Sequence, residues 1–251
     1  MTVSFDLDGL LVRNFFIDHV FPRLLNRYQG KLQKVDLNSL DDLLNQLQKL
    51  HEQKLKGDDP VAAFNWDRLV ADLFDTHPTT QTPFTNALQY MLERARPRPY
   101  PEVPSVLDKL SSLDELNMVV LTNGFVRYQK PILASCNLLK HFSRVYGPDR
   151  TGVVKPSPRA FRYVQKRERD YCLHVGDRLE TDIKGAQEAG LDSWLVQRHS
   201  NLPRGKHLDS SQEEERERIM ELIGEITPRY LSSSLKPAVK IIGNLRKTLN
   251  L

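Results

Sequence analysis

The stretch that decides the fold is Val3-Ser4-Phe5-Asp6-Leu7-Asp8-Gly9, near the start of this 251-residue chain. A short strand-like run leads directly into two carboxylates and a glycine. Acids placed just past a strand lie at the edge of an α/β sheet where ligands bind. The stretch therefore predicts the first strand of such a sheet, with Asp6 and Asp8 at its carboxyl end. Strand alternation further predicts that the two side chains point the same way.

A second group of acids stands far along the chain, after the apolar run 171–175. It consists of Asp177, which follows Gly176, and Asp182. Clustered carboxylates are unfavourable unless a cation neutralises them, and Mg²⁺ is a hard cation that prefers oxygen ligands. Together, the two acidic groups predict a magnesium site that does chemistry on an anion.

Two further segments supply groups that bind an anion. Thr122-Asn123-Gly124 follows the strand-like run 117–121, and a hydroxyl before a glycine-containing turn can offer O–H and backbone N–H donors to phosphate oxygens. Lys155-Pro156 places a cation before a rigid turn that leads into a helix beginning near residue 157 or 158. A lysine suits a phosphate as a point charge.

Four short motifs thus follow one another along the chain: Asp6-x-Asp8-Gly9, Thr122-Asn123-Gly124, Lys155-Pro156, and Gly176-Asp177 with Asp182. In this order, each beside the expected element, they resemble the motifs of the haloacid dehalogenase superfamily. The resemblance frames residues 1–11 and 98–200. The run 122–125, with Gln129 and Lys130, is most similar to the nucleotidase and sugar-phosphatase branch.

The resemblance implies a role for each residue. Asp6 would be the nucleophile that forms an aspartyl-phosphate, and Asp8 would protonate the leaving oxygen and later deprotonate the attacking water. Mg²⁺ would be held by the carboxylates of Asp6 and Asp177 and by the backbone carbonyl of Asp8. Asp182 would orient Lys155 or a metal-bound water. The remaining residues would bind the transferring phosphate: Thr122, Asn123, Gly124 and Lys155.

The order of predicted elements indicates an α/β protein with a Rossmann-like parallel sheet and a small helical-bundle cap. Four amphipathic helices are predicted within residues 12–97, at about 17–28, 38–50, 59–73 and 84–96. Prolines are dense over 97–104, where the chain returns to the core. Helices and strands then alternate, which implies a parallel sheet. We therefore expect a core domain of residues 1–11 and 98–251 and a cap domain of residues 12–97.

Within the core, the patterns predict these elements in order: a helix over 104–113, a strand to 121, a helix over 128–136, a strand near 145–146, a helix from 158, a strand to 175, a helix around 181–189 and a strand at 193–196. The stretch 198–226 is interpreted as a surface insertion with a charged helix over 212–226. An edge strand at 229–232 and a helix over 236–245 complete the chain.

Composition limits the possible partners. The net charge is only +4 and is spread along the chain, so nucleic-acid binding is not expected. Two cysteines are too few for a disulfide framework and favour a reducing compartment. The sequence holds neither an apolar run long enough to span a membrane nor a signal peptide, so we expect a cytoplasmic protein without a membrane partner. The expected partner is a small phosphorylated metabolite, and the sequence sets no oligomeric state.

Several alternatives stay open at this point. Dehalogenases of the superfamily attack carbon and lack the second aspartate, so Asp8 argues against them. A phosphosugar mutase of the same fold and a non-catalytic binding protein remain alternatives to a phosphatase. Arg13, near the expected cap hinge, is interpreted as a salt-bridge residue rather than a substrate contact. His174 is interpreted as a buried, hydrogen-bonded residue rather than a catalytic one.

Overall fold

The computed structural model describes residues 1–28, 39–74, 82–198, 226 and 228–248. A six-stranded parallel sheet with the order β3-β2-β1-β4-β5-β6 forms its centre. Its strands are β1 (Thr2–Phe5), β2 (Asn117–Leu121), β3 (Arg144–Tyr146), β4 (Tyr171–Gly176), β5 (Asp192–Val196) and β6 (Tyr230–Ser232). The predicted parallel α/β sheet is confirmed, with β3 and β6 at its two edges.

The register of the central strands brings distant motifs to one edge of the sheet. Phe5 of β1 lies opposite Val120 of β2 and Val175 of β4. Because the three strands run parallel, the chain leaves them on the same side. Asp6 and Thr122, which follow directly after β1 and β2, are therefore neighbours although they are far apart in the sequence.

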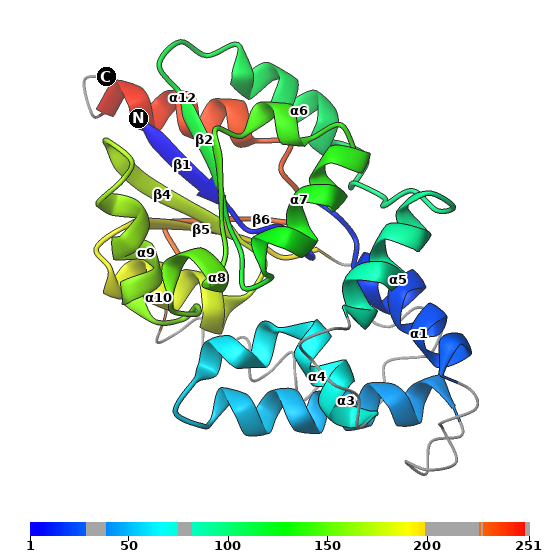
Figure 1. Ribbon diagram of the computed structural model, residues 1–251. Coiled ribbons are helices and arrows are strands. Elements are labelled where there is room, and N and C mark those ends of the chain that lie inside the picture. The colour runs from blue at the N-terminus through cyan, green and yellow to red at the C-terminus, as the bar shows by residue number, and fades with distance from the viewer. Residues whose placement is uncertain (29–38, 75–81, 199–225, 227, 249–251) are drawn as a thin grey trace, which may run out of the picture.

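Helices cover both faces of the sheet (Figure 1). One face carries α6 (Val103–Ser111), α7 (Val126–Ser135) and α12 (Ala238–Thr248), and the other carries α9 (Pro158–Gln165) and α10 (Lys184–Glu188). The short α8 (Pro148–Thr151) follows β3. Alternate residues of β2 pack on opposite sides, because strand side chains alternate. Val120 packs with the first set of helices, and Val119 and Leu121 pack with the second.

The segments between β1 and α6 form a layer of helices beyond the carboxyl ends of the strands (Figure 1). This helical layer comprises a π-helical segment (Phe16–Val20), α1 (Phe21–Arg27), α3 (Leu40–Leu55), a 3₁₀ helix (Pro60–Phe64), α4 (Trp66–Leu73) and α5 (Pro83–Leu92). Phe84 joins the layer to the core, since its ring lies 5.0 Å from that of Phe16 and 4.9 Å from that of Tyr128 on α7. The layer and the core share one apolar cluster.

Some predicted boundaries are wrong. A single helix was expected over 59–73, but Asp59 caps only the 3₁₀ helix, and Asn65 then leaves helical geometry with φ −85° and ψ 80°. The Asn65 side chain accepts from the backbone N–H of Arg68 and starts α4, because asparagine competes with the helix backbone for hydrogen bonds. The expected helix at 84–96 ends at Leu92, and that at 181–189 is a π-helical segment, Leu179–Ile183, followed by α10.

The end of the chain matches its prediction where it is described. The edge strand appears as β6 and the last helix as α12. The surface insertion and charged helix predicted over 198–226 lie almost entirely outside the described residues. In the part of the chain that the structure describes, no helix is long and apolar enough to cross a membrane.

Candidate active site

Lys155 lies at the centre of the candidate site. Its buried ammonium group donates to Asp6 Oδ1 at 2.7 Å and to Asp182 Oδ1 at 2.5 Å. The backbone of Lys155 is fixed in turn by the side chain of Asn123. Asn123 Oδ1 accepts from the Lys155 N–H at 2.7 Å, and Asn123 Nδ2 donates to the Lys155 carbonyl at 3.0 Å. The structure thus brings residues from all four of the predicted motifs into contact through Lys155.

Burial and the lysine charge set the protonation of these groups. Burial raises the pKa of Asp6 to about 8, although the charge of Lys155 opposes the rise. Burial raises the pKa of Asp177 to about 7. Burial would also raise the pKa of Asp182, but the adjacent Lys155 holds it well below its usual range. Asp182 and Lys155 therefore form an ion pair. Asp6 and Asp177 hold their protons more tightly than ordinary aspartates, and a bound cation would favour their ionised forms.

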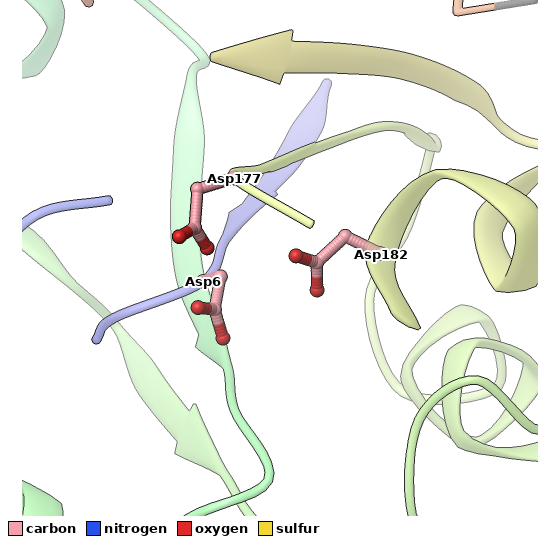
Figure 2. Close-up of side chains that lie close together, drawn as sticks. All are labelled: Asp6, Asp177 and Asp182. Carbon is pink, nitrogen blue, oxygen red and sulfur yellow. The ribbon is translucent and has the colours of Figure 1, made fainter. Parts of the chain in front are cut away.

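Three carboxylates converge in a way that suits a hard cation. One oxygen from each of Asp6, Asp177 and Asp182 lies within 4.8 Å of the other two (Figure 2). Oxygen-only donors with excess negative charge are the set that Mg²⁺ prefers. The donor set therefore fits the predicted magnesium site, and it includes Asp182 as well as the expected Asp6 and Asp177.

Two glycines allow the acids to approach this closely. Gly9 has φ +86°, and a Cβ atom there would lie 2.2 Å from Asp177 Oδ2. A Cβ atom on Gly176 would lie 2.3 Å from the Cβ of Asp182. Larger residues at either position would displace a carboxylate, and a positive φ also favours glycine at position 9.

Asp8 has a side-chain partner of its own. Strand alternation was expected to aim Asp6 and Asp8 alike, but β1 ends at Phe5 and both acids stand in the following loop, so alternation does not set the direction of their side chains. Asp8 Oδ2 instead accepts from Gln129 Nε2 of α7 at 2.6 Å. Burial raises the pKa of Asp8 to about 6.

The turn after β2 is fixed by hydrogen bonds of its own side-chain and backbone groups. The buried Thr122 accepts from the backbone N–H of Gly124 at its hydroxyl oxygen, 3.1 Å away. Thr122 N–H donates to the Tyr146 carbonyl at 3.0 Å, which anchors the turn to β3. The turn and Lys155 are held together by Asn123, so the predicted phosphate-binding residues form one unit.

A buried chain of hydrogen bonds extends behind Asp182. His174 Nε2 lies 3.4 Å from Asp182 Oδ1, and His174 Nδ1 lies 2.6 Å from Ser4 Oγ, which in turn lies 2.5 Å from the Tyr171 hydroxyl. Burial lowers the pKa of His174 to about 4, so the ring is neutral at neutral pH. The interpretation of His174 as buried and hydrogen-bonded is confirmed. Ser4 and Tyr171 were missed, because nothing in a strand's sequence marks which hydroxyls face a histidine.

A polar cluster at the junction of α4 and α7 was also missed. Asp67 is buried, and its carboxylate accepts from the Thr85 N–H at 2.9 Å and from the Tyr128 hydroxyl at 3.0 Å. The Arg127 guanidinium lies 3.6 Å from Asp67 Oδ2 and donates to Asn65 Oδ1 at 2.7 Å. In the sequence, Asp67 reads as an ordinary polar residue on the outer side of a helix.

Arg13 does not form the expected salt bridge within the part of the chain that the structure describes. Its guanidinium lies 5.7 Å from the centre of the Tyr100 ring, on the segment that returns from the helical layer. Arg13 N–H donates to the Arg98 carbonyl at 3.0 Å. The two chain crossings between the layer and the core therefore lie side by side.

Comparison with known proteins places this geometry in a family. The pyrimidine 5'-nucleotidase YjjG of Escherichia coli is 31% identical over 112 residues, which is 43% of this chain and 49% of that protein. A crystal structure of a HAD phosphatase from Thermococcus onnurineus has a TM-score of 0.67 at 22% identity and covers 96% of this chain and 97% of that one. YfnB from Bacillus subtilis, in a magnesium-bound structure that reveals interdomain movement, has a TM-score of 0.61 at 17% identity and covers 96% and 98%.

The two structural similarities show a shared fold. The chain spans about half the length of the curated relatives it matches. The family model for haloacid dehalogenase-like hydrolases matches residues 1–190, which hold all four motifs of the candidate site. The chain therefore belongs to the haloacid dehalogenase-like hydrolase family.

Proposed function

We propose that this chain is a Mg²⁺-dependent phosphatase that hydrolyses a small phosphate monoester through an aspartyl-phosphate on Asp6. The observation that carries the proposal is the contact of Asp6 with Lys155 inside a cluster of three carboxylates. A nucleophilic carboxylate beside a fixed cation is suited to attack an anionic phosphorus centre. The phosphatase and nucleotidase names of similar proteins support the same reaction class.

In the proposed reaction, Asp6 attacks phosphorus and the ester oxygen leaves as an alcohol. Asp8 gives that oxygen a proton, and then takes a proton from the water that hydrolyses the aspartyl-phosphate. Lys155 and the turn at 122–124 hold the phosphoryl oxygens throughout. A bound Mg²⁺ would supply further positive charge to the phosphoryl group and to the carboxylates of Asp6, Asp177 and Asp182, with the Asp8 carbonyl as a further ligand.

We also propose that residues 12–97 act as a cap, with residues 1–11 and 98–251 as the core domain. The helical layer lies beyond the carboxyl ends of the strands, which is the edge that holds Asp6 (Figure 1). The side-by-side crossings at residues 11–13 and 97–101 make a natural hinge. Closure would exclude water and select the substrate. The interdomain movement reported for magnesium-bound YfnB agrees with this proposal.

The test begins with metal-free protein and a panel of phosphorylated metabolites, with p-nitrophenyl phosphate as a general substrate. We expect release of inorganic phosphate with Mg²⁺ and none in excess EDTA. Full turnover in EDTA would refute the metal requirement. Conversion of a phosphosugar to its isomer without phosphate release would instead identify a mutase, and no reaction of any kind would favour a binding protein.

The role of Asp6 is tested by Asp6→Asn, which keeps the shape of the side chain but removes the nucleophilic carboxylate. We expect kcat to fall by roughly 10³-fold or more, with the far-UV circular dichroism spectrum unchanged. Asp108→Asn is the matched control, because Asp108 lies on α6 at the surface. A variant at position 6 with half of the normal kcat would remove Asp6 from the mechanism.

A further inference from the structure

We infer that Gln129 is a positioning residue that fixes the Asp8 carboxylate toward the leaving-group oxygen. The inference deepens the proposed function and rests on it, since it concerns the acid that would protonate the departing alcohol. Gln129 lies on α7 and is fully buried, and its Nε2 is 2.6 Å from Asp8 Oδ2.

The loop around Gln129 is shaped to admit its amide. A Cβ atom on Gly124 would lie 2.0 Å from Gln129 Nε2, so any larger residue there would push the amide away from Asp8. Gly124 belongs to the turn that would bind the phosphate. The backbone N–H of Gln129 donates to the Phe125 carbonyl at 3.1 Å, which fixes the start of its helix. The phosphate-binding turn and the support of Asp8 are therefore built from one continuous segment.

The other end of the amide argues against a purely structural role. Gln129 Oε1 is buried and has no hydrogen-bond partner among the described residues. A buried acceptor without a partner costs stability, whereas an apolar side chain of similar size would fill the same space without that cost. The contact with Asp8 gives a reason for a glutamine here, because a carboxylate needs a donor and an apolar residue has none.

The direction of the hydrogen bond defines what Gln129 does for Asp8. By donating to Oδ2, the amide turns the carboxyl group so that Oδ1 remains available to a substrate. A carboxyl group in the loop after β1 could otherwise rotate about its side-chain bonds. A fixed acid is worth most when the leaving oxygen is strongly basic and cannot depart without a proton.

The experiment compares phosphate esters with different leaving groups. In Gln129→Met, which keeps the volume but cannot donate, we expect kcat/KM for alkyl phosphates to fall by roughly 10- to 100-fold. For p-nitrophenyl phosphate, whose leaving group departs without a proton, the loss should be less than about 3-fold. The Mg²⁺ concentration for half-maximal activity should not change. Gln165→Met on α9 is the matched control, because Gln165 is a half-buried glutamine that donates to a backbone carbonyl instead.

Asp8→Asn separates failure of this inference from failure of the proposed function. Suppose that Asp8→Asn lowers kcat/KM for alkyl phosphates but not for p-nitrophenyl phosphate. If Gln129→Met then lowers kcat/KM equally for both kinds of ester, or for neither, Gln129 does not position Asp8. If Asp8→Asn itself shows no selectivity, the proposed role of Asp8 fails first. Should Gln129→Met not fold, Gln129→Glu serves instead: it should show the same selective loss, because its carboxylate repels Asp8, and an equal loss for both classes would overturn the inference.

Discussion

Asp6 and Asp177 bind protons more tightly in the folded chain than in an unfolded one. Burial raises their pKa values to about 8 and about 7, against an ordinary value near 3.8. At pH values between the ordinary pKa and the raised pKa values, folding therefore takes up protons. The contribution of these two groups to the free energy of unfolding is greatest at the acidic end of this pH range and falls as the pH rises. A divalent cation would compete with those protons for the same oxygens.

This linkage predicts how Mg²⁺ stabilises the protein. In EDTA, we expect the contribution of Asp6 and Asp177 to Tm to decline as the pH is raised from about 5 to about 8. We also expect Mg²⁺ to increase Tm more at about pH 8 than at about pH 6. Differential scanning calorimetry of the same sample with EDTA and with saturating Mg²⁺ measures both. Asp177→Asn should reduce the dependence. An equal Mg²⁺ effect at both pH values would contradict the assignment of these carboxylates to the metal.

At this scale, the sequence predicted which residues meet and missed how some of them are held. Asp6 and Asp177 were predictable because each follows a strand, and parallel strands present their carboxyl ends at one edge. Lys155 and Asp182 stand farther from a strand end, and the order of the four motifs predicted them. The contact of Asp8 with Gln129 was not predictable. It depends on where β1 ends and on how α7 is rotated, and both follow from packing of the whole core.

Among the elements, α7 connects the helical layer to the candidate site. Its residue Tyr128 is buried, and the hydroxyl donates to Asp67 Oδ2 at 3.0 Å and accepts from the Asp67 N–H at 3.1 Å. The next residue, Gln129, contacts Asp8. The same short helix thus fixes α4 through one side chain and the proposed acid through the next.

Removing the tyrosine hydroxyl should loosen the junction of α4 and α7. We expect Tyr128→Phe to lower the free energy of unfolding by about 1–3 kcal/mol, because the buried Asp67 loses a donor to its carboxylate and an acceptor for its N–H. Urea denaturation followed by circular dichroism measures the loss. Tyr163→Phe on α9 is a matched control, with an expected change within about 0.5 kcal/mol. Equal stability of the two variants would show that the Asp67 cluster does not hold the layer.

The elements also show where sequence patterns stop. Helical spacing predicted α3, and Ser39 begins it by accepting from the Asp42 N–H at 3.1 Å. The same reasoning predicted one helix that continues through Asn65. The structure instead ends the 3₁₀ helix before Asn65, and the side chain of Asn65 begins α4. A periodic apolar stripe shows which side faces the core, but it does not show a break that preserves the stripe.

For the molecule as a whole, alternation of helices and strands predicted a parallel sheet but not its strand order. That order places β1 between β2 and β4 and so brings the motif after each strand into one site. The helical layer lies at this same edge (Figure 1). Its contacts with the core include those of Phe84 and Asp67 and the two side-by-side chain crossings.

If the layer acts as a cap, the exposed loop at residues 56–59, between α3 and the 3₁₀ helix, should affect substrate choice more than metal binding. His51, near the end of α3, is held within the layer, since its Nδ1 lies 2.8 Å from the Ala63 carbonyl and its ring stacks on Trp66. We therefore choose Lys56→Ala and Asp58→Ala, and we expect the ratio of kcat/KM values among phosphate esters to change by several-fold to about 10-fold. Steady-state kinetics over the metabolite panel measures the ratio.

Lys109→Ala on α6 is the control for these loop variants, because Lys109 is exposed on a helix that covers the sheet. The Mg²⁺ concentration for half-maximal activity should stay the same in all three variants. A shift in metal affinity with unchanged substrate ratios would place specificity in the core loops instead.

The placement of Tyr128 and Gln129 side by side on α7 has a consequence for how this protein could evolve. A mutation in α4 that admits a bulkier ester would also shift the helix that supports Asp8, so broader selectivity and fast turnover would be hard to gain in a single step. Laboratory selection for a new substrate should then yield paired changes, one in α4 or α5 and a second within residues 125–129 that restores the rate.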